Sequence, residues 1–167
     1  MAQTKNDYLS NWKKVEDFEK KGLTKSALAE VMVIYNVAIK DNNDAQQIKS
    51  SMYQIKYRNM VDDDSHVNNI FFVDTLIEKA KTPVKNILQS MQAECFGSIY
   101  KTTAGKFTTA LNYKMKKSKD ITTWSIDKIH SVIGKLYKAS LQNDNLLKST
   151  KLDAFEPIII KEKIHAS

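Results

Sequence analysis

The sequence predicts an all-α protein of antiparallel helical hairpins with tetratricopeptide-like packing, about six helices and a short extended C-terminal segment. Three observations support this prediction. The chain has only 4 Gly and 2 Pro in 167 residues, too few for a sheet-rich fold with many tight turns. Apolar residues recur at helical spacing over most of the chain. Polar or acidic runs with helix-capping residues separate these periodic segments.

Size and composition indicate one globular core. The chain has 42% hydrophobic and 27% charged residues, which suffices for a single domain. We expect a helical-hairpin domain over residues 1–150 and an extended tail or linker over 151–167. The single cysteine excludes a disulfide framework, a Cys-x-x-Cys pair and a multi-thiolate zinc site within this chain.

Three helices are predicted in the N-terminal third. A helix over 6–21 ends in a Lys-Lys-Gly sequence typical of helix C-termini. Thr24 is the expected cap of the next helix, which runs to the polar residues 41–43. A third helix continues from Asp44 to the acidic run 62–64 and closes a hairpin with the second. The apolar positions of the three helices are Tyr8, Trp12, Val15 and Phe18, then Leu28, Val31, Met32, Ile34, Tyr35 and Ala38, then Ile48, Met52, Ile55, Tyr57 and Met60.

A second hairpin follows. The fourth helix begins near residues 64–65, ends near 79–81 and is dense enough in apolar residues to be central to the core. Thr82 is the expected cap of the fifth helix, with Pro83 at its first position. The apolar positions are Val67, Ile70, Phe71, Val73, Leu76 and Ile77, then Val84, Ile87, Leu88, Met91, Cys95 and Ile99.

The two hairpins share an apolar register at an offset of about 39 residues, which is within the range of helical-repeat units. The register fails where Tyr35 is matched with Asp74, and the tetratricopeptide signature is only partly present. The alternative is that two amphipathic hairpins align by chance. Matching pairs include Val31 with Ile70, Met32 with Phe71, Ile34 with Val73, and Tyr57 with Phe96.

The remainder of the chain is less regular. Residues 101–123 are rich in Lys and Thr and predict a long connection. Thr122 or Thr123 is the expected cap of a last helix over 126–141. The run over 155–160 contains Pro and three Ile, which predicts a strand or extended segment. A lone strand needs a sheet to join, so this run either lies across the helices or leads into a β-rich domain. We favour the second alternative.

The charge balance raises nucleic acid as a partner. There are 26 Lys and Arg against 19 Asp and Glu, a formal charge of +7. Arg58 is the only arginine, whereas base and phosphate recognition usually uses the bidentate guanidinium group. Stacking and phosphate contacts are conceivable only at 101–119, where Tyr100, Phe107 and Tyr113 are interleaved with lysines. A solvated lysine-rich surface is the favoured interpretation.

No metal site is predicted. His66, His130 and His165 have no second His or Cys at the spacings that zinc sites use. The acidic run 62–64 lacks the glycine and terminal glutamate of a calcium loop. It is better explained as a helix stop and N-cap.

No catalytic or cofactor-binding residue is predicted either. Glu94 beside Cys95 suggests a tuned thiol, but a buried free cysteine usually acts as a small hydrophobic residue. Trp12 and Trp124 are expected to be core anchors. The sequence also lacks a glycine-rich phosphate loop and a Gly-x-Ser-x-Gly motif. An enzyme would need a constellation that this sequence does not offer.

Short stretches between residues 8 and 160 carry a family resemblance. They are Trp12-Lys13-Lys14-Val15-Glu16, Lys21-Gly22-Leu23-Thr24-Lys25-Ser26-Ala27-Leu28, Ile34-Tyr35 with Ala38, Asn43-Asp44-Ala45-Gln46-Gln47-Ile48-Lys49, Lys56-Tyr57, Thr82-Pro83-Val84-Lys85-Asn86-Ile87-Leu88-Gln89-Ser90, Asp120-Ile121-Thr122-Thr123-Trp124 and Tyr137-Lys138-Ala139-Ser140-Leu141. In this order they resemble the N-terminal helical region of the large alpha-2-macroglobulin-like proteins of Bacteroidetes-type bacteria.

The resemblance implies an exported protein of the periplasm or cell envelope, in which this helical module precedes a series of macroglobulin β-domains. The Ile158–Ile160 run would lead into them. Members of that family are thought to act as protease traps or inhibitors, and some carry a thioester. This chain has no Cys-x-x-Gln thioester segment, because Cys95 is followed by Phe96-Gly97-Ser98.

The resulting hypothesis is a non-catalytic structural or protein-interaction module of a large exported alpha-2-macroglobulin-like protein. Its expected partners are the neighbouring β-domains of the same chain and other proteins or proteases, and no cofactor is expected. The alternative is a free-standing basic helical protein that binds nucleic acid with strong salt dependence.

Overall fold

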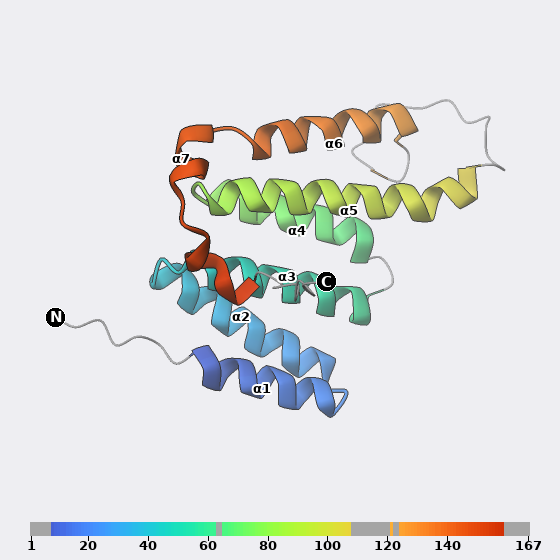
Figure 1. The fold of residues 1–167 in the computed structure, drawn as a ribbon. Helices are drawn as coiled ribbons and strands as arrows, with labels where there is room; N and C mark the ends of the chain where they lie inside the picture. Colours follow the sequence, from blue (N-terminus) through green and yellow to red (C-terminus); the bar gives the residue numbers. More distant parts are fainter. Residues whose placement is uncertain (1–7, 63–64, 108–120, 122–123, 159–167) are drawn as a thin grey trace, which may run out of the picture. The chain divides into compact units, whose positions relative to one another are not determined.

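The computed structural model describes residues 8–62, 65–107, 121 and 124–158, and this part of the chain is all-helical, as predicted (Figure 1). The elements are α1 (Tyr8–Lys20), α2 (Thr24–Lys40), α3 (Asp44–Val61), α4 (Ser65–Lys79), α5 (Val84–Phe107), α6 (Ile126–Ser140), α7 (Asp144–Ser149) and the 3-10 helix η2 (Leu152–Ile158).

The chain divides into two compact units, with the boundary inside α3. The first unit comprises the described residues up to Tyr57 and those from Ser149 onward, and the second comprises those from Arg58 to Lys148. Each unit has its own hydrophobic core. The predicted boundary between a 1–150 domain and a 151–167 tail stays a prediction.

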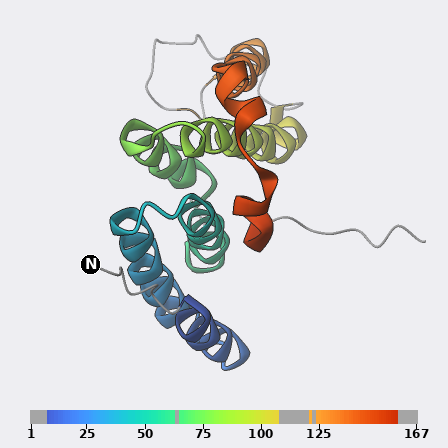
Figure 2. The same cartoon turned by 60° about the vertical axis from the view of Figure 1, so that its left-hand side comes forward.

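In the first unit, α1 and α2 form a close antiparallel pair (Figures 1 and 2). Gly22 ends α1 with a φ of 69°, and the amides of Gly22 and Leu23 donate to the carbonyls of Glu19 and Phe18. This is the predicted glycine ending. The expected Thr24 cap is wrong. Leu23 is the N-cap, without a side-chain cap bond, because the turn is so short that it serves both helices.

The turn from α2 to α3 uses two asparagines. Asn42 has a φ of 50°, and the Asn43 side chain accepts from the Gln46 amide at 3.2 Å. The predicted α2–α3 hairpin is modified, since the close backbone packing of α2 is with α1. Helix α3 joins both through a shared core. The buried members of this core are Trp12, Val15, Ala27, Val31, Ile34 and Tyr57.

In the second unit, α5 packs against both α4 and α6 (Figure 2). The predicted α4–α5 hairpin is therefore present. Pro83 was expected as the first helical residue, but α5 begins at Val84, and the Pro83 carbonyl accepts from the amides of Asn86 and Ile87. The buried members of the second core are Ile70, Phe96, Ile99, Ile121 and Ile129.

Two boundaries in this unit differ from the predictions. Helix α5 continues to Phe107, so residues 101–107 are helical and not part of the connection. Extending a formed helix adds one hydrogen bond per residue without a new nucleation cost, which outweighs a low apolar content. Helix α6 is capped by Ser125, whose side chain accepts from the Lys128 amide at 3.2 Å. The expected caps, Thr122 and Thr123, lie outside the described residues.

The C-terminal part also differs. The six-residue α7 was not predicted and carries a Lys148–Asp144 ion pair of 2.6 Å. Leu152–Ile158 forms η2, where an extended segment was expected. Phe155 is buried, and local i to i+3 bonds satisfy the backbone without a sheet partner. Ile159 and Ile160 lie outside the described residues.

The predicted 39-residue register has a structural counterpart. Val31 and Ile70 are both buried, and so are Ile34 and Val73. Met32 and its counterpart Phe71 are both about half exposed. The register therefore identifies equivalent inner and outer positions on α2 and α4. The register fails at the pair Met60 and Ile99, because Met60 of α3 is exposed and Ile99 of α5 is buried.

Buried side-chain amides connect the helices of the second unit. Asn86 on α5 donates to the carbonyls of Ser140 and Gln142, at 3.0 and 2.8 Å, and so satisfies the C-terminus of α6. Gln92 on α5 donates to the Asp74 carboxylate of α4 at 2.6 Å. These bonds fix the register of α5 against its neighbours on both sides.

We expect Asn86→Ala to lower the free energy of unfolding by about 1–3 kcal/mol, because two helix-terminal carbonyls lose their buried donor. Urea unfolding followed by circular dichroism measures the change. Asn36→Ala, at an exposed position within α2, is the matched control and should change stability by less than about 0.5 kcal/mol. Equal effects of the two substitutions would contradict the assigned role of Asn86.

Candidate functional site

His130 is the histidine whose side chain the structure describes, and it belongs to no metal-binding group. His130 is exposed on α6, with its ring centroid 4.9 Å from that of Tyr100. The described structure includes neither the side chain of His66 nor any part of His165. Within the described ranges, no group of three His, Cys, Asp or Glu side chains could hold a metal ion.

Cys95 is half-buried beside the second core. Burial, and to a lesser extent the charge of Glu94, raise the pKa of its thiol. A raised pKa keeps the thiol protonated and weakly nucleophilic at neutral pH. The Glu94 carboxylate accepts a hydrogen bond from the Tyr137 hydroxyl of α6. This geometry gives Cys95 a packing role.

The remaining candidates from the sequence have mainly structural contacts. Asp62 accepts from the Asn68 side chain at 2.8 Å, and its carbonyl accepts from the Ser65 amide. Asp63 and Asp64, and the side chains of the lysine-rich 101–119 segment, lie outside the described part. Trp12 is buried, as predicted. Trp124 is partly buried and stacks on Phe96, with 5.8 Å between ring centroids.

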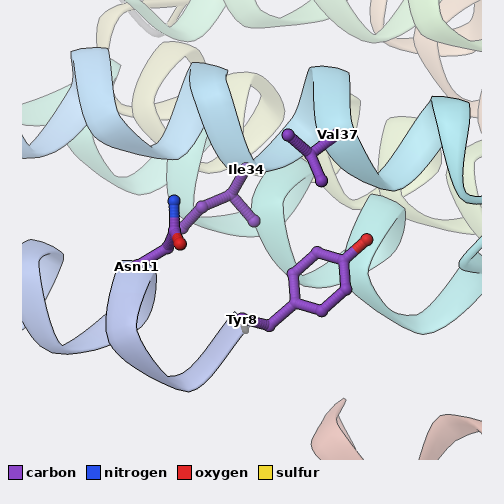
Figure 3. Close-up of a pocket in the computed structure, with 4 residues that line it drawn as sticks. All are labelled: Tyr8, Asn11, Ile34 and Val37. Atoms are coloured by element: carbon purple, nitrogen blue, oxygen red, sulfur yellow. The ribbon is translucent and has the colours of Figure 1, made fainter. Parts of the chain in front are cut away.

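A small hollow lies between α1 and α2, lined by Tyr8, Asn11, Ile34 and Val37 (Figure 3). Its volume is about 80 Å³, far below the several hundred Å³ of a typical organic-ligand site. The Tyr8 hydroxyl donates to the Asp41 carboxylate at 2.7 Å. The hollow has room for a few waters at most and is not a ligand site.

A polar and aromatic seam joins α1 to α3. The Trp12 indole donates to the Gln46 side-chain oxygen at 2.7 Å, and both residues are buried. The Tyr53 ring lies 4.8 Å from the Trp12 ring, and the Lys49 ammonium lies 4.3 Å from the centroid of the same ring. The indole N–H is thus satisfied and the ring is covered on more than one side.

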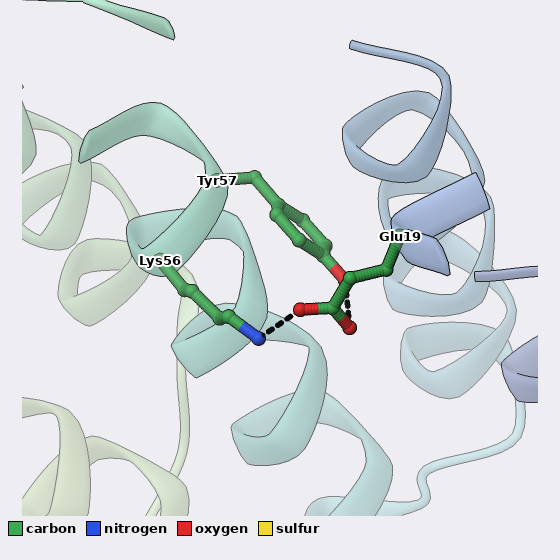
Figure 4. A network of polar contacts seen from close by, with 3 residues as sticks. All are labelled: Glu19, Lys56 and Tyr57. Atoms are coloured by element: carbon green, nitrogen blue, oxygen red, sulfur yellow. Dashed lines mark hydrogen bonds and ion pairs between the residues drawn. The ribbon is translucent and has the colours of Figure 1, made fainter. Parts of the chain in front are cut away.

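The other end of this seam is a three-residue network (Figure 4). Lys56 and Tyr57 of α3 donate to the two carboxylate oxygens of Glu19 on α1. The hydrogen bond from Lys56 is the main cause of a lowered pKa at Glu19. Burial, then the charge of Glu19, raises the pKa of Tyr57. Together with the Trp12–Gln46 bond, the network holds α1 parallel to α3.

These contacts hold α2 with one face inward and leave the opposite face uncovered. Ala27, Val31, Ile34 and Ala38 point into the unit and are buried. Met32, Val33 and Ile39 are 45%, 49% and 43% exposed, and Ala29 and Asn36 are exposed between them. We call these five residues, Ala29, Met32, Val33, Asn36 and Ile39, the outer face of α2. Three large apolar side chains exposed on the same side of one helix mark a candidate interaction surface.

Sequence reasoning assigned Met32 to the apolar stripe of the core and did not identify the outer face. In the sequence, Val33 and Ile39 are the residues that could have indicated this face. They lie outside the inward stripe, so α2 carries more large apolar side chains than one buried face requires. Only the burial of each residue separates the two sets.

No described helix combines the length and apolar character needed to span a bilayer.

Replacing Gln46 by Ala should cost about 1–3 kcal/mol of unfolding free energy, since the buried Trp12 N–H would lose its acceptor. The substitution Gln142→Ala removes an exposed side chain and serves as the matched control. Thermal and urea unfolding give the two values. A similar loss in both variants would show that the Trp12–Gln46 bond does not stabilise the seam.

Alkaline pH should weaken the fold through Tyr57. Its folded pKa is raised above the ordinary value of 10, so its contribution is complete below about pH 10 and is lost as the pH rises above it. Unfolding free energies measured between about pH 8 and about pH 11 should fall more steeply for the wild type than for Tyr57→Phe. Lysine deprotonation is common to both proteins and cancels in this comparison. Parallel pH profiles would contradict the prediction.

No known family model, curated protein or solved structure matches this chain.

Proposed function

We propose that this chain is a non-catalytic helical module that contacts other proteins, within a large exported alpha-2-macroglobulin-like protein of the cell envelope. The observation that carries the interaction role is the outer face of α2, with three large apolar side chains 43–49% exposed. Exposed apolar clusters of this kind are typical of protein-binding surfaces.

The polar contacts and shared core of the first unit support this role. The Trp12–Gln46 bond and the Glu19 network hold α1 against α3, and the inner residues of α2 pack into the same core. A partner that binds the outer face of α2 would therefore meet a preorganised helix, with little ordering cost on this side.

The family part of the proposal is supported by the sequence resemblance alone. It supplies export, the macroglobulin β-domains as neighbours and a role in protease inhibition or trapping. The thioester step is not assigned to this chain, because Cys95 lacks a glutamine three residues later and its half-buried thiol has a raised pKa.

An antibody raised against these 167 residues tests the family part. We expect a native gene product much larger than the 19.1 kDa of this chain, recovered in the envelope fraction of the cell. Marker proteins of the cytoplasm and the envelope are the controls for fractionation. A cytoplasmic band near 19 kDa would overturn this part of the proposal.

A further inference from the structure

The outer face of α2 is bordered by a lysine at each end. Lys25 and Lys40 are both exposed. At about 100° per residue they project within roughly 60° of each other, on the same side as Asn36. They are 15 positions apart in the sequence, or about 22 Å along the helix axis. The three large apolar side chains lie between them.

The single acidic residue of α2 faces away from this surface. Glu30 accepts from the Asn11 side chain at 3.2 Å and lies 3.7 Å from the Lys14 ammonium, both on α1. Asp41, directly after the helix, accepts from Tyr8 of α1. The carboxylates are therefore drawn toward α1, and the outer face of α2 has an apolar centre with a positive charge at each end.

This charge pattern argues against a second copy of the chain as the occupant. Two outer faces packed antiparallel would place Lys25 opposite Lys40, and a parallel arrangement would place each lysine opposite itself. Either arrangement opposes like charges at both ends. Nucleic acid is also disfavoured, because Asn36 is the only side-chain donor among the five residues of the outer face, and its large apolar side chains offer nothing to a phosphate.

We infer that the outer face of α2 binds an amphipathic helix whose apolar stripe is flanked by acidic residues about four turns apart. Such a helix would place its apolar side chains on Met32, Val33 and Ile39 and its carboxylates near Lys25 and Lys40. The apolar contacts supply most of the affinity, and the two lysines set register and selectivity. This inference rests on the proposed interaction role and names the chemistry of the partner.

A designed peptide pair tests the inference. Each peptide is an amphipathic helix of about 18 residues with the same leucine stripe, and carries two Glu at each end in one version and two Lys at each end in the other. Binding to the complete chain is measured by fluorescence anisotropy. We expect the Glu-ended peptide to bind wild type at least tenfold more tightly than the Lys-ended peptide.

Three variants locate the site. Lys25→Glu/Lys40→Glu should reverse the peptide preference, and Met32→Ser/Val33→Ser/Ile39→Ser should abolish binding of both peptides. The control Lys135→Glu/Lys138→Glu changes two exposed lysines of α6 and should bind as the wild type does. The circular dichroism spectrum of each variant must match that of the wild type. Because charge reversal predicts a gain for the Lys-ended peptide, misfolding cannot imitate the expected result.

The inference is overturned if the wild type binds neither peptide, or binds both equally, or if the charge-reversed variant keeps the original preference. Self-association in analytical ultracentrifugation that the serine variant abolishes would assign the face to a second copy instead. Binding to phosphatidylglycerol vesicles in place of the peptide would assign it to a lipid surface. None of these results alters the size and fractionation test, so the two proposals fail separately.

Discussion

The hydrogen bond from the Trp12 indole to the Gln46 side chain is the constraint on which the first unit depends. Both groups are buried, so neither can exchange its partner for water without cost. The bond fixes the position of α1 along the axis of α3. The hydrogen bonds of Glu19 fix the same relative position near the C-terminal ends of both helices. With α1 and α3 fixed, one orientation of α2 buries Val31 and Ile34.

The helices of the second unit are also joined by hydrogen bonds from buried side chains. Asn86 and Gln92, both on α5, are buried and donate to groups on α6 and α4, respectively. Carboxamides suit this purpose because they satisfy carbonyl or carboxylate partners without placing a new charge in the core. Helix α5 is consequently the central element of its unit, held on two sides by directional bonds in addition to apolar packing.

Fixing α2 from one side has a consequence for function. Helix α2 has 17 residues and carries large apolar side chains on both its inner and its outer side, and apolar helix faces are normally covered by other elements. The inner residues of α2 are buried in the core, and Met32, Val33 and Ile39 remain exposed within the described structure. The charged residues separate in the same way, because contacts with α1 hold Glu30 while Lys25 and Lys40 stay exposed. The seam between α1 and α3 thus determines which part of α2 stays exposed.

The sequence by itself determined the helical class and most helix boundaries, because these depend on local signals. The glycine ending at Gly22, the start of α3 at Asp44 and the start of α4 at Ser65 all follow from residues within one turn. Local signals also misplaced some ends. Thr24 is a typical capping residue, but the N-cap of α2 is Leu23, in the short turn that follows α1. The low apolar content after Lys101 predicts a connection, but α5 continues to Phe107.

Only the tertiary structure decided which apolar residues are buried and which are exposed. Met32 and Val31 are adjacent in the sequence and similar in character, yet one is 45% exposed and the other fully buried. Their difference depends on where α1 and α3 lie, and those positions depend on Trp12, Gln46 and Glu19, of which Trp12 and Gln46 are 34 residues apart in the sequence. Contacts at such separations leave no local pattern, so the outer face of α2 became visible only once the helices were packed.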